Sequence, residues 1–421
     1  MILHLDLDSF FASAHRSLDP SLLDIPIAVG GRSNLKIFER SKMGIKLYDT
    51  NSGAFVNPVF YNDKEQDFKS FFVDVVDGKE KIRGIITTSS YEAREFGVKT
   101  GMSVNEAILR CPNLTVLTPN YLLYHQLSND LHTFLRSKIP MVEQYSIDEF
   151  FGDIKGWIDD DNIFSFAQEL KDEIKTRFNL PISIGIAEGK WIAKLATNHA
   201  KPDGICLIPK GKMYEFIKDI PIEEFPGIGK GYQQRLEKYS IKTLGDVVAN
   251  KELLYQWKKP GIQLYNKIIG KDHEIIKKEN DRKSIGISRT FDPIKSRNEI
   301  KRRIIIMARH IIYMTLKLDA NPTSYYLKIN YNYAYKVKKS RTINRIFSEK
   351  LCKEVFTEIF DEIDKQHGFI IKLSMSVSNF STKKLSLIEL ESDLTQNNLS
   401  KTIQKMREKY SLDVLKSASE L

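Results

Sequence analysis

The sequence predicts a multidomain protein of mixed α/β and α+β class, and three observations indicate this. The chain has 421 residues, more than a single hydrophobic core usually organises. Segments with the period-two alternation of a strand are interleaved with segments that have the three-to-four spacing of an amphipathic helix. Charge is also unevenly divided, because residues 1–208 hold 23 basic and 28 acidic side chains, whereas residues 209–421 hold 41 and 26.

This charge asymmetry favours a protein that grips a polyanion beside an acidic site. A basic half can also bind an acidic membrane surface or serve solubility, and composition alone does not separate these. The apolar content of 42% is ordinary. No run of about 18 apolar residues predicts a membrane span, and the N-terminus lacks the basic region and cleavage site of a signal peptide. The three cysteines lie far apart without metal-ligand spacing, as expected for reduced thiols in a cytoplasmic protein.

The first element is a strand, because three leucines alternate with His4, Asp6 and Asp8 over residues 3–8. Asp6 and Asp8 therefore share one face of it. A second acidic pair, Asp148 and Glu149, lies in an apolar and aromatic segment that reads as a short strand or hairpin turn. Taken alone, that pair is most simply an exposed turn, since buried carboxylates are rare.

The two acidic segments point to a metal site if their strands are neighbours. Three carboxylates would then converge, and hard divalent cations such as Mg²⁺ prefer oxygen ligands. Two such ions can stabilise the attacking and leaving oxygens of an in-line phosphoryl displacement.

Six motifs in this sequence resemble those of the family Y (translesion) DNA polymerases, and the closest branch is the bacterial DNA polymerase IV type. They occur in the order of that family and extend over most of the chain. The motifs are D-x-D-x-F-F from residue 6, T-S-S-Y-E-A-R-E-F-G-V at 88–98, S-I-D-E from residue 146, A-K-P-D-G at 200–204, P-G-I-G at 226–229 and R-K-S-I-G at 282–286.

The resemblance implies a right-hand polymerase with palm, fingers, helix-hairpin-helix thumb and α/β little finger. The palm would comprise residues 1–17 and 120–208. Its catalytic residues would be Asp6, Asp148 and Glu149, which with the Leu7 carbonyl would hold two Mg²⁺ ions. Asp8 follows the motif but is expected to be structural. Helices over 121–138 and 164–178, a strand over 181–187 and a helix from 191 onward would build a sheet backed by helices.

The incoming nucleotide would be held from two sides. A helix that begins after Ser90 offers its N-terminus and an arginine to phosphate groups. By resemblance, the nucleotide contacts are Phe10, Phe11, Thr88, Tyr91, Arg94 and Lys201. Phe11 matches the steric gate, a ring that would collide with a ribose 2′-hydroxyl, and core packing at the helix start is its alternative role. The family usually has Asn where Gly189 stands, so this sequence departs from the pattern in that loop.

The fingers would cover residues 18–119, with an unusual insertion at about 33–82. The family shows a short turn there, whereas this segment is long and rich in aromatic residues. Such a density argues against a solvated disordered loop, and residues 71–76 read as a strand before an Asp-Gly turn. One interpretation is a folded extension that packs on the fingers, and the other is an exposed aromatic surface that touches template or a partner.

The thumb would cover residues 209–276 and contain the helix-hairpin-helix. Its Gly227 and Gly229 would let backbone N–H groups approach DNA phosphates beside Lys230. Such a loop binds the DNA backbone without reading sequence. A plain helical hairpin is the alternative. Residues 277–283 read as a linker.

The little finger would cover residues 284–380 in the order strand, helix, strand, strand, helix, strand. The expected strands are 284–291, 324–331, 339–346 and 370–377, and the expected helices are 298–318 and 348–366. Its basic residues are expected to contact the DNA backbone, with plain surface charge as the alternative for each. They are Arg282, Lys283, Arg289, Lys336, Lys338, Lys339 and Arg341.

The C-terminal tail, 381–421, contains a peptide that resembles the sliding-clamp-binding motif of bacterial polymerases. It is Lys384, Leu385, Ser386, Leu387 and Ile388, and it departs from the motif in having Lys384 instead of Gln and in lacking the terminal aromatic. An ordinary strand or linker is the alternative. A charged helix is expected over 392–421.

The expected function is therefore template-directed DNA synthesis by a monomer that binds primer-template DNA, dNTPs and, through the C-terminal peptide, the sliding clamp. No stretch resembles a proofreading exonuclease, so synthesis would be error-prone, and the family implies bypass of damaged template during DNA repair. Two rival functions remain. A nucleotide cyclase shares paired palm carboxylates but lacks the thumb motif, and a catalytically idle DNA-binding scaffold would not need all three carboxylates.

Overall fold

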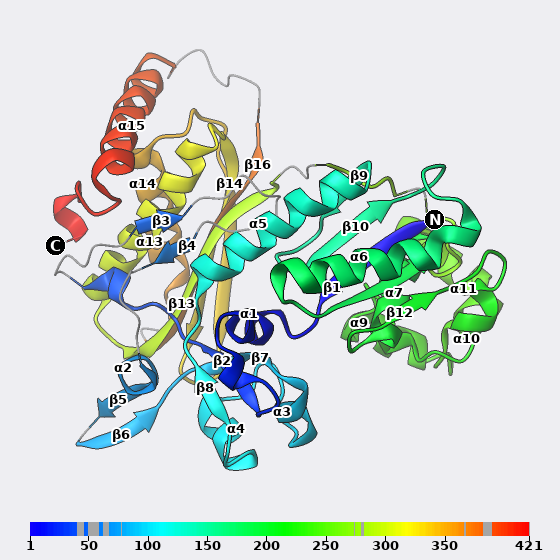
Figure 1. Cartoon of the computed structure of the whole chain (residues 1–421). Coiled ribbons are helices and arrows are strands. Elements are labelled where there is room, and N and C mark those ends of the chain that lie inside the picture. Colours follow the sequence, from blue (N-terminus) through cyan, green and yellow to red (C-terminus); the bar gives the residue numbers. More distant parts are fainter. Residues whose placement is uncertain are drawn as a thin grey trace. The chain divides into compact units, whose positions relative to one another are not determined.

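The computed structural model describes residues 1–39, 46–48, 59–61, 67–76, 78–272, 274–278, 282–365, 368–381 and 390–420. These residues form two compact units (Figure 1). Unit 1 contains 1–31, 67–76, 78–272 and 274–278, and unit 2 contains 32–39, 46–48, 59–61, 282–365, 368–381 and 390–420.

The centre of unit 1 is a five-stranded sheet in the order β12-β11-β1-β10-β9. Neighbouring strands are antiparallel except β11 and β12, which are parallel. The predicted strand-helix alternation is confirmed here. The strands are β1 Ile2–Leu7, β9 Met141–Gln144, β10 Glu149–Asp153, β11 Ile182–Ala187 and β12 Ile205–Leu207, and the helices are α1 Phe10–Leu18, α5 Tyr121–Lys138, α6 Ile163–Phe178 and α7 Lys190–Ala200.

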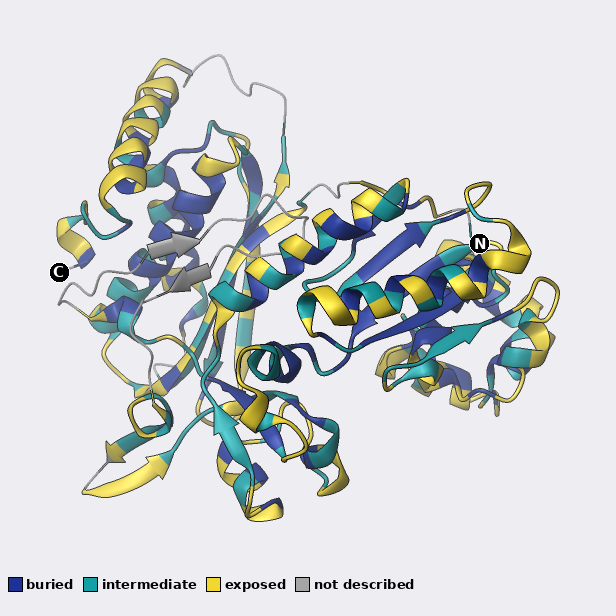
Figure 2. Cartoon of the chain, viewed as in Figure 1, coloured by how far each residue is buried: buried dark blue, intermediate teal, exposed yellow. Residues whose placement is uncertain are grey.

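Helices cover both faces of this sheet. The apolar sides of α5 and α6 pack with Leu3, Leu5 and Ile184 in one core, and Figure 2 shows that their outer sides are exposed while the strands beneath are buried. Helix α7 lies on the opposite face and approaches β11 closely. A Cβ at Gly185 would lie 2.1 Å from the Ala193 carbonyl oxygen, so only glycine permits this approach.

A second, three-stranded sheet of unit 1 has the order β7-β2-β8. It consists of β2 Ile27–Gly31, β7 Ile85–Ser89 and β8 Thr115–Leu117, with helices α3 Tyr91–Glu95 and α4 Val104–Arg110 and the short 3-10 helix Pro20–Leu22. The side-chain hydroxyl of Ser90 accepts a hydrogen bond from the Ala93 N–H, which confirms the predicted start of α3.

The second half of the insertion packs against this three-stranded sheet. It forms helix α2 Phe68–Phe72 and the hairpin β5 Val73–Val76 and β6 Lys79–Ile82. The strand predicted for 71–76 is thus wrong at its first two residues. Asp67 accepts a hydrogen bond from the Ser70 N–H and caps a short helix that continues through Phe72. The Phe72 ring is fully buried, and a Cβ at Gly30 would lie 2.4 Å from it.

The rest of unit 1 is helical from residue 213 onward. These helices enclose a core built around Phe225, Leu236 and Leu264, which also includes residues of α7. Thr243 and Asp246 form a capping box at the start of α10. The helices are α8 Met213–Ile217, α9 Lys230–Glu237, α10 Leu244–Ala249, α11 Lys251–Gln256 and α12 Lys258–Ile268, with 3-10 helices at Asp160–Asn162 and Ile222–Glu224.

Unit 2 contains a four-stranded antiparallel sheet in the order β13-β16-β14-β15, and its helices pack on one face. The predicted order of strands and helices is confirmed, although β15 lies about three residues earlier than expected. The elements are β13 Ser284–Ile294, α13 Arg297–Lys317, β14 Pro322–Tyr331, β15 Lys336–Thr342, α14 Glu349–Ile363, β16 Ile370–Phe380, α15 Leu390–Tyr410, the antiparallel pair β3 Lys46–Tyr48 and β4 Val59–Tyr61, and the 3-10 helices Lys36–Phe38 and Ala418–Glu420.

The first half of the insertion does not share the core of the three-stranded sheet. Ile37 and Phe38 are buried in the core of unit 2, among residues of α13, α14 and the four-stranded sheet. The expectation that the insertion packs on the fingers therefore holds for residues 67–76 and 78–82, but not for residues 32–39. Buried contacts with residues some 250 positions later in the chain leave no pattern in the local sequence.

Candidate active site

The acidic segments meet because β1 and β10 are neighbours. Their antiparallel register places Asp6 directly opposite Glu149, where Cα atoms are about 5 Å apart. The Leu7 N–H donates to the Asp148 carbonyl oxygen at 3.0 Å, which fixes the turn before β10 at the same end of the sheet. Asp6 and Glu149 are therefore direct neighbours, and Asp148 lies in the turn that adjoins them.

Two lysines pair with these carboxylates. Lys201 Nζ lies 2.8 Å from Asp6 Oδ2, and Lys194 Nζ forms an ion pair with Glu149. Lys201 follows α7 and Lys194 lies within it, so one helix on the back of the sheet supplies both positive charges. Lys201 was identified from its motif. Lys194 was missed because a lysine in an amphipathic helix looks like surface charge.

The ionised forms of two carboxylates in the acidic cluster are disfavoured. Burial raises the pKa of Asp6 to about 6, Lys201 opposes that shift, and Glu149 adds to it. The pKa of Asp148 is also raised, first by burial and then by repulsion from Asp6. Repulsion between carboxylates that share a site disfavours their ionised forms. A cation bound among them would remove this penalty.

The donor chemistry of the cluster fits a hard divalent ion, since its side-chain ligands are carboxylate oxygens. Over the part of the chain that the structure describes, however, no three His, Cys, Asp or Glu side chains are gathered as a ready metal cage. Asp6 and Glu149 are instead each directed at a lysine.

Asp8 has a different environment from Asp6, although the two are only two residues apart. Its carboxylate accepts hydrogen bonds from the Tyr91 hydroxyl at 3.0 Å, the Ser183 hydroxyl at 2.7 Å and the Asp203 N–H at 2.8 Å. It is buried. These bonds join three distant segments, so Asp8 supports the corner of the site, in line with its expected structural role.

The expected nucleotide contacts on α3 lie beside this corner. The Arg94 guanidinium stacks over the Tyr91 ring at 4.5 Å, and it donates to the Ser89 carbonyl and the Ser9 hydroxyl, each at 3.1 Å. Thr88 is half-buried on the neighbouring strand. Ser9, to which the sequence assigned no role, has a left-handed backbone (φ 48°). Its hydrogen bond with Arg94 links the β1–α1 corner to α3.

Phe11 projects from the first turn of α1 and is only partly buried, whereas Phe10 is in the core. The Phe11 ring stacks on Tyr124 of α5 with centroids 4.2 Å apart and planes 13° apart. The Tyr124 hydroxyl is in turn 2.8 Å from His15 Nε2. The Phe11 ring is therefore held in one orientation and still presents an open side.

A buried ion pair lies behind the acidic strand. Lys190 Nζ lies 2.9 Å from both Glu143 carboxylate oxygens, and the Lys277 N–H donates to Glu143 at 3.0 Å. Sequence reasoning missed this cluster, because Glu143 stands beside the polar Gln144 at the end of a short strand and looks solvated there. It fixes the start of the 277–283 linker to the sheet.

The glycines of the hairpin loop in unit 1 are exposed. Gly227 has φ 102°, which other residues rarely adopt, and nothing lies within 4 Å of a Cβ placed on Gly227 or Gly229. Gly229 begins α9, and the exposed Lys230 is its first residue. An open loop before a helix N-terminus can receive a phosphate.

The basic residues of unit 2 lie on different faces of its sheet. Lys336 and Lys338 are opposite Asn330 and Lys328 on the open face, and both are exposed. Lys339 and Arg341 are opposite the buried Leu327 and Tyr325 on the helix-covered face. There Lys339 pairs with Glu362, and Arg341 pairs with both Glu362 and Glu358.

The remaining expected DNA contacts also differ in their surroundings. Arg289 lies opposite the buried Leu373 and donates to the Asn34 carbonyl oxygen at 3.2 Å. Burial lowers its pKa to about 10. Arg282 is half-buried and Lys283 is exposed. The expected clamp-binding residues 384–388 lie outside the described residues.

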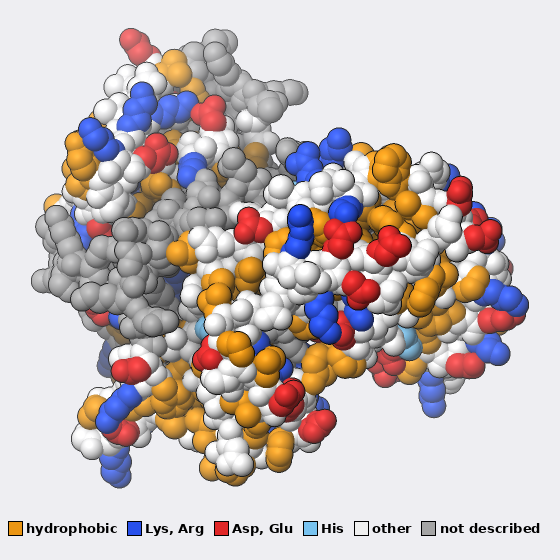
Figure 3. Space-filling model, in the orientation of Figure 1, with side chains coloured by type: hydrophobic (Ala, Val, Ile, Leu, Met, Phe, Trp, Pro, Cys, Tyr) orange, Lys and Arg blue, Asp and Glu red, His pale blue; other side chains and the backbone are white. Residues whose placement is uncertain are grey.

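The outer face of α5 and α6 carries charges of both signs, as Figure 3 shows. Lys138 there pairs with Glu173 at 2.7 Å. This mixed surface does not have the single sign expected of a phosphate-binding face. Among the helices described, none combines the length and apolar character that a membrane crossing requires.

Two family models match this chain, one in its N-terminal part and one in its C-terminal part. Residues 55–198 match the model of the impB/mucB/samB family, and residues 282–390 match the model of the impB/mucB/samB family C-terminal domain. DNA polymerase IV of Photorhabdus laumondii is 31% identical over 296 residues, which cover 69% of this chain and 70% of that protein. DNA polymerase IV of Oceanobacillus iheyensis is 28% identical over 435 residues, with 99% and 91% covered.

Solved structures with the same fold extend over nearly the whole chain. A Y-family DNA polymerase chimera superposes with a TM-score of 0.71 at 20% identity, covering 91% of this chain and 99% of that chain. DinB from Sulfolobus solfataricus superposes with a TM-score of 0.54 at 21% identity, covering 90% and 98%. The architecture of this chain is thus one already known from solved structures.

Proposed function

The chain belongs to the Y family of DNA polymerases, and we propose that it synthesises DNA at the cluster formed by Asp6, Asp148 and Glu149. The observation that carries this proposal is the β1–β10 register, which sets Asp6 against Glu149 beside the Asp148 turn. The enzyme is a DNA-directed DNA polymerase that acts in translesion synthesis. An idle scaffold would have no reason to keep three carboxylates in mutual repulsion.

We assign the hand-like parts as follows. The five-stranded sheet is the palm, the three-stranded sheet is the fingers, the helices from residue 213 to 268 are the thumb, and the four-stranded sheet with its helices is the little finger. The open face of β14, β15 and β16, which carries Lys336 and Lys338, is proposed to lie on the DNA backbone together with the Gly227–Lys230 loop.

Asp6, Asp148, Glu149 and the Leu7 carbonyl oxygen would hold the divalent ions on which this class of enzyme depends, two Mg²⁺ in our proposal. When bound, the ions supply a lowered pKa for the primer 3′-hydroxyl and charge stabilisation for the leaving pyrophosphate. Support comes from the raised pKa values of Asp6 and Asp148, which are caused first by burial and then by neighbouring carboxylates, because a bound cation would offset both effects.

The lysines and the arginine have a separate role in this proposal. Lys201 and Lys194 balance Asp6 and Glu149 in the metal-free protein, and with the ions bound each ammonium group would be available to neutralise a phosphate. Tyr91, Arg94 and Thr88 would orient the triphosphate from the fingers. Phe10 fixes the start of α1, and the partly exposed Phe11 ring would exclude a ribose 2′-hydroxyl.

Primer extension tests the proposal directly. Purified protein with Mg²⁺ and a primed template should incorporate dNTPs but not rNTPs. Glu149→Ala should lose at least a hundredfold in rate while keeping DNA affinity, and Asp172→Ala, which removes an exposed carboxylate on α6, should not change the rate. Phe11→Ala should gain ribonucleotide incorporation. Unchanged extension by Glu149→Ala would overturn the assignment of the site.

We also propose that the monomer acts in the cytoplasm and that residues 384–388 bind a sliding clamp. Support for the peptide is its sequence alone. Replacing Leu385 and Leu387 with Ala should shorten extension products only when a loaded clamp is present. An equal effect without the clamp would contradict this role.

A further inference from the structure

Residues 32–39, here called the arm, are built into the core of unit 2. Ile37 and Phe38 are each 6% exposed. The Phe38 ring meets Phe291 of β13 edge-on, with centroids 6.3 Å apart. The Arg303 guanidinium of α13 lies 4.5 Å from the Phe38 centroid and 4.7 Å from the Phe291 centroid. The arm thus occupies a socket that combines apolar and cation–π contacts.

Hydrogen bonds fix the arm along its length. The Arg302 guanidinium donates to the Phe38 carbonyl oxygen at 2.6 Å. Arg289 donates to the Asn34 carbonyl oxygen at 3.2 Å, and the Thr290 N–H donates to the Ser33 hydroxyl at 3.3 Å. Two of these three bonds use arm carbonyl groups, one before the 3-10 helix Lys36–Phe38 and one at its last residue, so they fix the arm backbone in one register.

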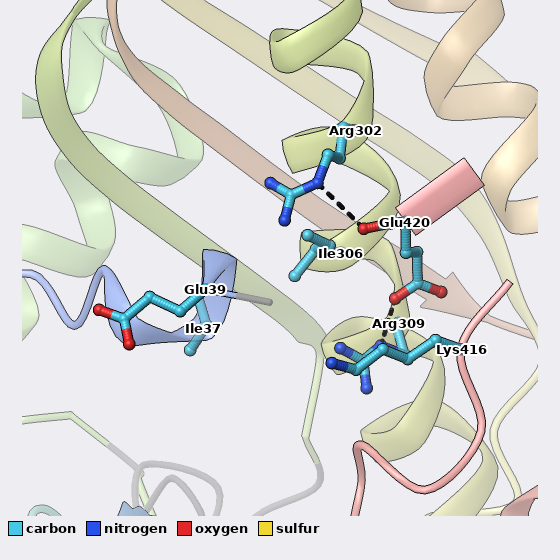
Figure 4. Close-up of a pocket in the computed structure, with 7 residues that line it drawn as sticks. All are labelled: Ile37, Glu39, Arg302, Ile306, Arg309, Lys416 and Glu420. Carbon is cyan, nitrogen blue, oxygen red and sulfur yellow. Dashed lines mark hydrogen bonds and ion pairs between the residues drawn. The ribbon is translucent and has the colours of Figure 1, made fainter. Parts of the chain in front are cut away.

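The same helix of unit 2 also holds the C-terminal segment beside the arm. Figure 4 shows Arg302 and Arg309 of α13 directed at Glu420, with Ile37 and Glu39 of the arm lining the same small cavity. Arg302 Nε donates to the Glu420 carbonyl oxygen at 3.0 Å, and Arg309 Nε lies 2.7 Å from its fully buried carboxylate. Arm, α13 and C-terminal segment therefore form one packed junction.

We infer that the arm, which begins the insertion, holds the little finger. It thereby gives that domain a second attachment besides the 277–283 linker. The chain supports this inference by its connectivity. Gly31 still pairs with Ile85 in the fingers sheet of unit 1, whereas Ser33, two residues later, is bonded to Thr290 in unit 2. A docking contact held by so short a connection acts at high effective concentration, so even weak contacts persist.

This inference is independent of the chemistry at Asp6 and goes beyond it. A cut in the 277–283 linker leaves the arm on the N-terminal fragment and its socket on the C-terminal fragment. If the arm is docked, the two fragments remain together without a covalent connection.

The test is therefore a specific protease site inserted after Lys278 in the full chain. After complete cleavage, the two fragments of the otherwise unchanged protein are expected to co-elute on size exclusion and to retain primer extension. The double change Ile37→Asp and Phe38→Ala should make them elute separately and should abolish extension only after cleavage. Phe164→Ala, which removes a half-exposed ring from α6, is the matched control and should behave like the parent.

Two results would overturn the inference. Separation of the parent fragments would show that the arm does not hold the little finger. Co-elution of the fragments of the double variant would show that other contacts hold the little finger. Hydrogen exchange of the uncleaved chain guards against misfolding, because loss of the arm contact should raise exchange in α13 and β13 while α5 stays protected. Unchanged exchange in α13 would likewise contradict the inference.

Discussion

At the scale of single residues, Asp6 and Asp8 show how neighbours with the same chemistry acquire different functions. Both follow from one alternating strand, and the sequence could place them on one face. Asp8 meets three hydrogen-bond donors, whereas Asp6 meets Lys201 and two other carboxylates. The Asp8 carboxylate is therefore satisfied by hydrogen bonds within the protein, whereas Asp6 has an ion pair with Lys201 and still faces repulsion from Glu149.

Asp6→Asn should stabilise the metal-free protein while removing activity. The folded pKa of Asp6 is about 6, above its ordinary 3.8, so the folded state binds more protons between these values. Its ionisation consequently costs stability as pH rises through that window, and removing the charge should return roughly 1–3 kcal/mol at pH 7. Urea unfolding in EDTA measures this. A loss of stability in Asp6→Asn would contradict the inference that ionised Asp6 destabilises the metal-free protein.

Asp8→Asn should have the opposite effect on stability. An amide NH₂ would face donors that now meet a carboxylate oxygen, so a buried hydrogen bond is lost and a donor is left opposed. The expected cost is about 1–3 kcal/mol. The same urea titration compares the stability change of Asp8→Asn with that of Asp6→Asn. Equal changes would show that position on the strand, and not the surrounding donors, determines the effect of the substitution.

At the scale of elements, β15 divides the basic residues of unit 2 between two faces of its sheet. The sequence alone showed lysines and arginines in that stretch but not which of them lack a carboxylate partner. The expected strand began at 339, so it did not assign Lys336 and Lys338 to a face. The register with β14 decides this. Lys336 and Lys338 are on the open face, and Lys339 and Arg341 pair with glutamates of α14.

Lys338→Ala and Lys339→Ala form a matched pair of variants on adjacent residues. Lys338→Ala should weaken DNA binding several-fold, regardless of sequence, and lower the salt dependence of log K by about one contact. Lys339→Ala should leave the salt dependence unchanged, since its charge is already paired with Glu362. Fluorescence anisotropy over a salt series measures both. A larger effect at Lys339 would place the DNA on the other face.

At the scale of the whole molecule, titratable groups are distributed differently in the two units. In unit 1, burial lowers the pKa of His4, His125 and His132 and raises those of Asp6, Asp148 and Asp272, so their effects on acid stability oppose one another. In unit 2, burial holds the pKa of His310 well below its ordinary value, with further lowering by Arg309.

Unit 2 is therefore expected to be the acid-labile part of the molecule. A histidine whose folded pKa is depressed contributes stability above its unfolded pKa of about 6.5 and loses it as pH falls below that value. At pH 5 the loss is about 2 kcal/mol if His310 stays neutral. Hydrogen exchange in α13 and α14 at pH 7 and pH 5 checks this. His310→Phe should remove much of the difference, and an unchanged difference would assign it to other groups.

The order of the elements and the residues of the acidic cluster could be predicted along the chain. Alternation and helical spacing are local, and the six motifs are contiguous, so both can be read along the chain. The strand at 1–8, helix α5 and the pattern over 284–380 all follow from such signals.

Which side chains contact one another could be learned only from the folded chain. The pairs Lys194–Glu149 and Lys190–Glu143, the seat of Phe11 on Tyr124 and the placement of Ile37 and Phe38 in unit 2 all join residues far apart in the chain. Contacts of this kind depend on register and on close packing of the core. Neither leaves a periodic trace in the sequence, so a buried partner and a solvated surface residue look alike there.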